Sequence, residues 1–504
     1  MTILATYDDF SQGEHGILGA WKAPAGSFTG LNVVRYEDGS IGPRGGLSPL
    51  AFTGMPAGDL LALGTGKTAG GTLKCWFVKG GTAYSFDAVA SGTLAVATYS
   101  GAAFTAPTAG TPTASINKQG VTYWINGTAG TYHKIDHDTA AVSLLTAPTG
   151  LVAQAHQISF TQYGVQSVWA SSFANRLYWS APDNPESFPA PNFVDIGDPH
   201  LGITGIFVQR SHLIVAKEHA GFNGEWWMIT GVLGGDYTVR RIAIGPAPSG
   251  PDSCVMTPGG NVVGIANNQQ TLPVNFTGST LSMERALRES INGAFRYATP
   301  LWTDDDVVLV SSLNDNTEMR LLYSRDTAWT RHRLELGPSG YSLSKAWVAC
   351  FPGSDTFIFG TDGRTSFSRW SAYANDPRGG TYGAVFSPAS ADRCAFTLPE
   401  WWSRDDEEVT VSSVTIDFRN FVIAGTNTFT ITVTPLRLYE GTDGTPATFT
   451  FSEAAPGSDR NQRRQATFLL EHGNGFRIKV DNIRGVAIQK ILVHGEPNRA
   501  PGDD

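Results

Sequence analysis

The sequence predicts an all-β protein: a divergent β-propeller of six or seven blades, followed by a small antiparallel β-sandwich. Composition is the first indication, since 504 residues include 57 Gly, 11% aromatic residues and only 16% charged residues. Such a chain has many turns and few of the residues that surface helices require. The second indication is that short alternating runs recur at intervals of roughly 35 to 50 residues, the spacing of four-stranded propeller blades.

The alternating runs define the order of the elements. Residues 1–49 are interpreted as an entry segment, and the propeller is predicted over residues 50–372. Each run has a strand, a tight Gly, Asn or Asp turn and a return strand, as β-hairpins do. The clearest are LKCWFVKGGTAYSFD (73–87), GVTYWINGTAGTYHKID (120–136), SSFANRLYWSAP (171–182), RSHLIVAKEHAGFNGEWWMI (210–229) and DTFIFGTDGRTSFSRW (355–370).

One stretch departs from the strand pattern. In LSMERALRESINGAF (281–295), Met283, Leu287 and Ile291 lie at helical spacing, and Ser282 occupies the position of an N-cap. A short helix between blades is expected here. It would cover an exposed strand edge.

The composition changes after residue 372. Residues 373–399 are rich in Pro, Gly and Ser and are interpreted as an ordered linker. Residues 400–497 contain successive runs with a period of two, which predict the antiparallel sandwich. Residues 498–504 are expected to be a frayed tail.

Charge and cysteine content exclude several classes of protein. With 36 basic and 45 acidic side chains, the formal net charge is −9, which does not suit a protein that binds a phosphate backbone tightly. The four cysteines lie far apart without a CxxC pair, so we expect reduced, buried side chains: Cys75, Cys254, Cys350 and Cys394. No secretion signal is visible, and no run approaches the roughly 18 apolar residues of a membrane span. A soluble protein made in a cytoplasm, with no membrane partner, is expected.

The stretch LGTGKTAGG (63–71) raises the question of a phosphate-binding loop. The Walker pattern requires a Gly where Leu61 stands and a helix after Lys67, but an apolar strand pattern follows Lys67. A Gly-rich hairpin turn is therefore predicted.

Two stretches with several Asp residues raise the question of a metal site. In HKIDHD (133–138), His133 and His137 could share a strand face, but a metal would need further ligands from elsewhere, so a polar blade tip is the favoured interpretation. The run DDD (304–306) lacks the spacing of a calcium loop. No metal or cofactor site is predicted.

Motifs of catalysis are also missing from the sequence. It contains no GxSxG elbow and no HExxH. SRDTAW (324–329) faintly resembles the Asp-box of sialidases, but Ala328 replaces the Gly, and that box is a structural turn. We therefore predict no catalytic residues and a protein that is not an enzyme.

Two stretches resemble bacteriophage tail nozzle and tail-tube proteins. GLNVVRYEDGSIGPRGGL (30–47) is similar to their entry segment, where an Asn, a short strand, a Gly turn and an Arg-Gly lead into a propeller. In residues 167–227, NRLYW, a Pro-rich connection, NF, GITG and a strand ending in EWW follow one another as in that family. LLYSRDTAWTRHRL (321–334) and IQKILVHGEP (488–497) fit the same scheme. The family includes the packaged-DNA stabilising proteins of short-tailed phages.

The resemblance implies a structural virion protein, made in the host cytoplasm and located in the virion tail. Such a nozzle or hub subunit would form a homo-oligomeric ring, a hexamer, between portal or adaptor and tail fibre proteins. The ring would surround the DNA exit channel and retain or pass the genome. The acidic balance agrees, because a negative lumen repels phosphates and lets double-stranded DNA slide without specific binding.

Two alternatives from other classes are kept. A receptor- or carbohydrate-binding propeller of the tail would place aromatic side chains such as Trp226 and Trp227 in a pocket, although such side chains more commonly fill a blade core. A third hypothesis is a propeller glycoside hydrolase, whose acids would converge from different blades without a short motif.

Overall fold

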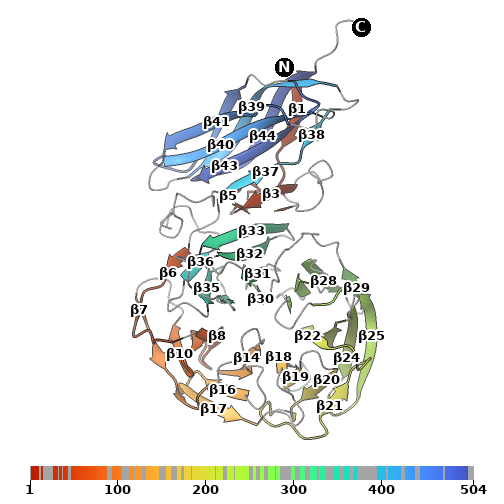
Figure 1. Cartoon of the computed structure of the whole chain (residues 1–504). Helices are drawn as coiled ribbons and strands as arrows, with labels where there is room; N and C mark the ends of the chain where they lie inside the picture. The colour runs from red at the N-terminus through yellow and green to blue at the C-terminus, as the bar shows by residue number, and fades with distance from the viewer. Residues whose placement is uncertain are drawn as a thin grey trace. The chain divides into compact units, whose positions relative to one another are not determined.

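The computed structural model of the chain is all-β in the residues that it describes (Figure 1). The predicted fold class is confirmed: a β-propeller, here of seven described sheets, and a β-sandwich. The described part contains no helix that could span a membrane. The structure describes the chain except for residues 1, 11–12, 15–26, 32, 37, 44–46, 59, 88–92, 105–113, 119, 126–131, 147–154, 161–166, 172–174, 183, 210–211, 219–223, 232, 249–253, 257–261, 266–270, 278–279, 284–296, 301–306, 313–317, 326–327, 336–345, 351–355, 362–367, 372–393, 404–406, 422–425, 438–442, 469–471 and 498–504.

The chain divides into two compact units. One comprises Met1–Ser48, Leu321–Glu335 and Trp370–Asp504, and it contains the sandwich. The other comprises Pro49–Arg320 and Leu336–Arg369, and it contains the first strand of every propeller sheet.

The propeller sheets follow one another in chain order. The first three are β8(Leu60–Lys67), β9(Leu73–Lys79), β10(Thr82–Asp87) and β12(Ala97–Thr98); β14(Ala114–Lys118), β15(Val121–Ile125), β16(Tyr132–Asp136), β17(Ala141–Leu145) and β13(Ser100–Gly101); β18(Ala155–Phe160), β19(Ser167–Ser171), β20(Arg176–Trp179) and β21(Phe193–Asp195). The next three are β22(Ile203–Gln209), β23(His212–Lys217), β24(Gly224–Gly231) and β25(Tyr237–Gly245); β26(Cys254–Met256), β27(Val262–Ile265), β28(Thr271–Thr277) and β29(Thr280–Met283); β30(Tyr297–Pro300), β31(Val307–Ser312), β32(Glu318–Arg325) and β33(Ala328–Glu335). A parallel pair, β7(Phe52–Thr53) and β11(Leu94–Ala95), lies outside these sheets.

The seventh sheet closes the ring. It has the order β34(Ala346–Cys350), β35(Thr356–Thr361), β36(Ser368–Ser371) and β6(Leu47–Pro49), so its last strand comes from the N-terminal end of the propeller. The first strand of each sheet contacts the first strand of the next, and β34 contacts β8. Strands from the two ends of the propeller are thereby joined in one sheet.

Each blade packs on both faces, which explains its apolar runs. In β23, Leu213 and Val215 belong to one buried cluster with Leu177 of the preceding sheet. The alternate residues Ile214 and Ala216 belong to a second cluster with Val262 of the following sheet. A strand between two such interfaces is apolar on both sides.

The helix predicted for residues 281–295 is wrong at its start. Leu281–Met283 belong to β29, which pairs antiparallel with β28 through Val274 and Met283. The tertiary pairing of a hairpin outweighs the helical spacing of the apolar side chains. Residues 284–295 of that prediction lie outside the described part of the chain.

The sandwich consists of two sheets. One has the order β4(Val33–Arg35), β5(Ile41–Pro43), β44(Val486–Pro497), β39(Val409–Asn420) and β42(Arg460–Thr467), with β1(Thr2–Tyr7) also paired to β44. The other has the order β2(Gly13–Glu14), β3(Ser27–Leu31), β37(Ala395–Thr397), β43(Gly475–Arg484), β40(Thr426–Leu436) and β41(Ala447–Ala454), with β38(Trp401–Trp402) paired to β43. Five strands of the N-terminal segment therefore complete the sandwich, a role that the sequence did not indicate.

Period-two alternation fills the sandwich core. In β40, Phe429, Ile431 and Val433 are fully buried, and threonines occupy the alternate positions. Phe10 and Phe28 from the N-terminal segment pack edge-on against Phe396. The N-terminal segment thus contributes to the same core as the C-terminal strands.

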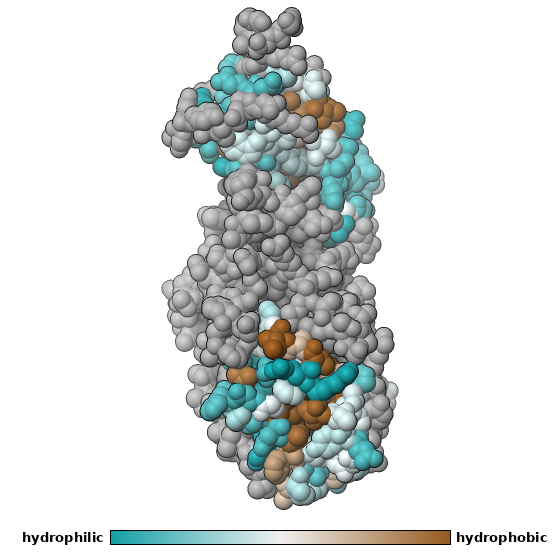
Figure 2. Space-filling model, turned by 90° about the vertical axis from the view of Figure 1, so that its right-hand side faces the viewer, coloured by the Kyte–Doolittle hydropathy of each residue, from teal (hydrophilic) through white to brown (hydrophobic). Residues whose placement is uncertain are grey.

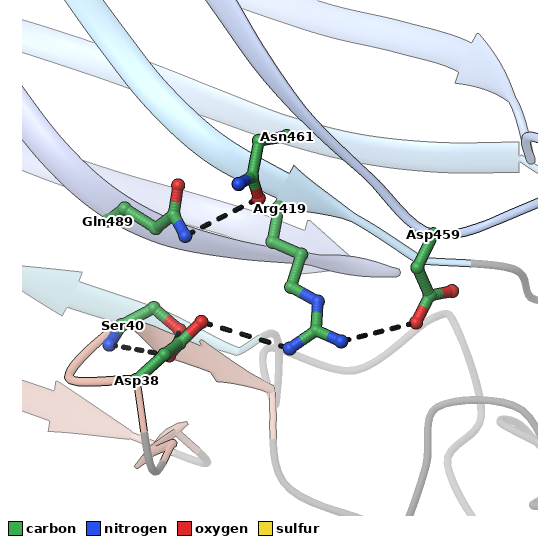
Figure 3. Close-up of polar contacts among 6 residues, drawn as sticks. All are labelled: Asp38, Ser40, Arg419, Asp459, Asn461 and Gln489. Carbon is green, nitrogen blue, oxygen red and sulfur yellow. Dashed lines mark hydrogen bonds and ion pairs between the residues drawn. The ribbon is translucent and has the colours of Figure 1, made fainter.

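A polar clamp also holds the N-terminal segment (Figure 3). The Arg419 guanidinium on β39 lies 3.8 Å from Asp38 and 3.5 Å from Asp459, which precedes β42. Its carbon Cζ also lies 5.1 Å from the centroid of the Phe421 ring. One side chain thereby connects two loops that are far apart in sequence.

Candidate functional site

The Gly-rich stretch 63–71 is a hairpin, as its pattern predicts. β8 ends at Lys67, the backbone N–H of Thr68 donates to the Thr72 carbonyl at 2.9 Å, and β9 begins at Leu73. A strand therefore follows Lys67 where a phosphate-binding loop would require the N-terminus of a helix.

The HKIDHD stretch is more buried than a polar blade tip. His133 is 1% exposed, and its ring stacks on Phe104 with 4.3 Å between centroids. Its Nε2 lies 3.3 Å from the carbonyl oxygen of Ala103. Burial lowers the pKa of His133. This histidine therefore packs as a neutral aromatic side chain.

His137 joins the first two propeller sheets. Its Nδ1 lies 2.9 Å from the Tyr99 hydroxyl, and its Nε2 lies 2.7 Å from the Thr122 hydroxyl. Burial lowers the pKa of His137 to about 4. Next to it, Asp138 accepts a hydrogen bond from the backbone N–H of Ala69 in the hairpin turn between β8 and β9.

The two acidic residues of HKIDHD are occupied with local hydrogen bonds. Asp136 accepts from the backbone N–H groups of Asp138 and Thr139, which hold the turn after β16. Among the described side chains, no group of three or more His, Cys, Asp or Glu could hold a metal ion. The run 304–306 lies outside the described part of the chain.

The two tryptophans proposed for a binding pocket have different surroundings. Trp226 is fully buried, stacks on Phe207, and donates from Nε1 to the Pro246 carbonyl at 2.8 Å. Trp227 is partly buried and donates to Glu225 Oε2 at 3.0 Å. Trp226 is therefore a blade-core side chain, and the pair does not line a pocket together.

A more accessible aromatic group lies on the neighbouring sheet. Phe193 of β21 is 38% exposed, and the Arg176 guanidinium of β20 covers its ring at 3.9 Å from the centroid. Arg176 also donates two hydrogen bonds to Asp195, at 2.7 and 2.8 Å. Tyr178 lies 6.4 Å from Phe193 between ring centroids. We call Arg176, Tyr178, Phe193 and Asp195 the Phe193 site.

Strand register explains why these four side chains share a face. Arg176 pairs with Asp195 and Tyr178 pairs with Phe193, two positions along the same ladder. Residues two apart on a strand point to the same side. Leu177, between Arg176 and Tyr178, belongs to the opposite, buried face. The Phe193 site is therefore the polar and aromatic face of this hairpin.

The electrostatics of the site depend on its ion pair. The hydrogen bonds from Arg176 hold the pKa of Asp195 below its ordinary value. Asp195 in turn raises the pKa of Arg176. Both partners stay charged over the physiological range, and their side chains are 39% and 46% exposed. The site presents a fixed donor and a fixed acceptor beside an aromatic ring.

A buried lysine supports the loop that follows Asp195. Lys217 of β23 has no exposed surface, and its ammonium donates to the carbonyls of Ile196 and Asp198. Burial lowers the pKa of Lys217, whereas nearby Glu225 and Asp198 raise it. Glu225 pairs with Lys217 in the β23–β24 ladder and accepts from Arg241 at 2.9 Å. The ammonium satisfies the carbonyl of buried Ile196, whereas the Asp198 carbonyl also accepts from the backbone N–H of Leu201 at 3.2 Å.

The outer strand of the next sheet provides a contrasting surface. Figure 2 shows hydrophobic and hydrophilic residues side by side on the part of the propeller where β25 lies. On β25, Arg240 and Arg241 are exposed, and Ile244 is 60% exposed. Charged side chains on an outer strand discourage pairing with other chains.

Comparisons with known proteins find resemblance to propellers at low identity. No protein-family model and no curated protein matches the chain. Similar solved structures include a protein assigned as a 6-phosphogluconolactonase from Bacteroides uniformis, with 12% identity, TM-score 0.41, and coverage of 55% of this chain and 84% of that one. The WD40 domain of Toxoplasma gondii coronin has 7% identity, TM-score 0.35, and coverage of 64% and 83%. The SapL1 lectin in complex with alpha methyl fucoside has 12% identity, TM-score 0.32, and coverage of 61% and 89%.

The prediction that the chain is not an enzyme is corrected by these comparisons. Two of the similar structures are assigned as a gluconolactonase and a 6-phosphogluconolactonase, which contradicts that prediction. Motif searches detect residues close in sequence, whereas a propeller brings side chains together from separate blades. At this identity, no activity is transferred to this chain.

Proposed function

We propose that the propeller is a carbohydrate-binding module and that the Phe193 site is where the sugar binds. The observation that supports this is an exposed ring with an exposed Arg–Asp ion pair on one sheet face. Sugars present C–H faces that pack on aromatic rings and hydroxyls that both donate and accept hydrogen bonds. Ligand sites generally combine apolar surface with a few fixed polar groups of this kind.

Each side chain has a separate role in this proposal. The Phe193 ring offers apolar contact, the Asp195 carboxylate accepts hydrogen bonds from sugar hydroxyls, and Arg176 donates to sugar oxygens. Lys217 acts at a distance, because it fixes the carbonyls of the loop directly after Asp195. The ligand is expected to be neutral, since the ion pair leaves no net charge at the site.

Glycan-array screening followed by isothermal titration with the best glycan tests the proposal. Phe193→Ala and Asp195→Asn should each weaken binding by at least about tenfold, which corresponds to roughly 1.4 kcal/mol. Ile244→Ala serves as the matched control, because it removes an exposed apolar side chain from another sheet. Equal affinity of all three variants, or no glycan bound, would exclude the site. Chromatography of the recovered glycan would reveal turnover and support the hydrolase hypothesis instead.

A second proposal places the protein in a bacteriophage tail as a subunit of a homo-oligomeric ring, a hexamer. Residues 167–227, which resemble the nozzle family, include the successive strands β19 to β23 and the first half of β24, and the chain carries a formal charge of −9. The partners would be portal or adaptor and tail fibre proteins. Double-stranded DNA would pass without specific binding, because like charge disfavours phosphate contacts.

Electron microscopy of virions and of concentrated protein tests the second proposal. A six-fold annulus below the portal is expected. Contacts between neighbours should exceed roughly 1,000 Å², the lower limit for specific interfaces. Tight binding of duplex DNA with a steep salt dependence would argue against a passage role. A protein found only as a monomer at fibre tips would argue for the carbohydrate-binding proposal alone.

A further inference from the structure

The sandwich has an open edge with an unusual charge. β42 is the last strand in its sheet order and pairs with β39 from Ser413–Thr467 to Asn420–Arg460. Its other backbone edge pairs with none of the described strands. The strand reads RNQRRQAT, with three arginines and no acidic residue, in a chain whose net charge is −9.

The arginines are accessible from solvent. The side chains of Arg460, Arg463 and Arg464 are 50%, 68% and 45% exposed. Exposed ion pairs contribute little to stability, since water solvates both partners well. These side chains are therefore available to a partner at small cost.

Neighbouring acids within the chain neutralise this strand only in part. Arg463 forms a two-point ion pair with Asp417 on the outward face of the sheet. Arg460 and Arg464 both approach one carboxylate oxygen of Glu453, each at 3.5 Å. Arg419 is held by Asp38 and Asp459 instead (Figure 3). The three arginines of β42 thus have two carboxylate partners, Asp417 and Glu453, while Asp38 and Asp459 are paired with Arg419.

Like charges exclude a symmetric contact at this edge. Two antiparallel copies of β42 would bring six arginines together, and like charges across a strand pair are destabilising. An unpaired strand edge otherwise favours addition of another strand. The suitable partner is therefore an extended segment with negative charge, and not a second β42 strand.

The chain itself contains an acidic segment. The sequence Asp405-Asp406-Glu407-Glu408 is its longest acidic run. Glu407 and Glu408, directly before β39, are exposed and belong to no helix or strand. We propose that β42 binds the acidic segment before β39 of a second copy of this chain, by strand addition. The contact is head-to-tail, because one copy offers its arginines and the other its acids.

This inference rests on the ring that forms the second proposed function. Head-to-tail contacts use two different surfaces of each subunit, so each copy can bind one neighbour on each side. Such contacts form a closed ring when the rotations from each subunit to the next add up to a full turn. The charge pattern favours this head-to-tail arrangement, because the arginines of one copy attract the acidic residues of the next, whereas like-charged surfaces repel each other.

Charge reversal and charge exchange test the proposal by sedimentation velocity with the full-length protein. Arg460→Glu together with Arg464→Glu should weaken self-association at least about tenfold, as loss of complementary charge does at interfaces. Adding Glu407→Lys and Glu408→Lys to the same chain restores opposite charges at every contact and should recover assembly. Arg240→Glu is the control, an exposed arginine on the outer strand β25. Circular dichroism confirms that each variant is folded.

The outcomes separate this inference from the ring proposal. If the variant with Arg460→Glu and Arg464→Glu assembled into rings as strongly as the wild type, the β42 contact would be overturned and the ring proposal would be unaffected. Dispersal of the arginine variant without recovery in the fourfold variant would overturn the acidic segment as the partner. A wild-type protein that stays monomeric at every concentration would overturn both.

Discussion

The sandwich and the propeller bury their side chains in different ways. The described sandwich has one large hydrophobic cluster, which includes residues from Phe10 to Val493, and a small one around Phe421 and Ala487. Its strands β39 and β44 each have 12 residues. The propeller has separate clusters between neighbouring sheets, and β20 has only 4 residues. Buried polar groups such as His137 and Lys217 lie among these smaller clusters. The sandwich also buries polar side chains, such as the hydrogen-bonded pair Asn420 and Asn427, but these do not titrate. Blade contacts therefore depend on protonation in a way that the described core of the sandwich does not.

The largest expected effect comes from the aromatic centre of the sandwich. Phe429 is fully buried, and its ring centroid lies 5.1 Å from that of Phe418 and 5.0 Å from that of Phe451. Phe429→Ala should lower the free energy of unfolding of the sandwich by about 3–5 kcal/mol, because it removes a buried ring and leaves a cavity. Denaturant unfolding measures the change.

A matched control lies on the opposite face of the same strand. Thr432→Ala on β40 should change the free energy of unfolding by less than about 1 kcal/mol, because its side chain lies outside the core. If both variants were equally stable, the assignment of Phe429 to the large core cluster of the sandwich would be wrong.

Acid should affect the propeller through His137. Burial lowers the pKa of this histidine from 6.5 to about 4. Between these two pH values, the histidine is therefore neutral in the folded state and protonated in the unfolded state. Its contribution to stability is present above pH 6.5 and is lost as the pH falls toward 4. The full loss is of order 3 kcal/mol, and Asp136, Asp138 and Lys74 are the charged groups that also act on it.

Thermal unfolding from pH 7 to pH 4 measures this dependence. The His137→Gln variant keeps side-chain hydrogen bonding to Tyr99 or Thr122 but does not titrate, so its melting temperature should fall less with acid. An identical acid dependence in the variant and the wild type would show that other groups control the propeller. Phe429→Ala should leave the acid dependence of the propeller transition unchanged.

The smallest expected effect concerns the clamp on the N-terminal segment. Arg419 is 39% exposed and lies 3.8 Å from Asp38 and 3.5 Å from Asp459. Arg419→Gln should cost less than about 1 kcal/mol, because exposed ion pairs are weak. Limited proteolysis and calorimetry measure it. Release of the N-terminal segment in this variant would show that the clamp, rather than the packing of Phe10 and Phe28, holds the segment.

The sequence alone was sufficient to predict strands and hairpins, because alternation and turn residues act over short distances. The stretch NRLYW was identified as a blade strand, and residues 63–71 as a hairpin. The helix at residues 281–295 failed at its start because Leu281–Met283 pair with β28, a contact that helical spacing does not reveal.

Long-range pairing was decided by the tertiary structure. β1 pairs with β44 from the other end of the chain, and β6 completes the sheet that begins with β34. In the Phe193 site, Arg176 and Asp195 are 19 positions apart and meet only through the register of β20 and β21. In the sequence, Lys217 is an ordinary charged residue at the end of a strand. Only the tertiary structure shows that its ammonium donates to two loop carbonyls. Local sequence thus determined which residues form strands, whereas the partners of those strands depended on burying a common core, which no local pattern records.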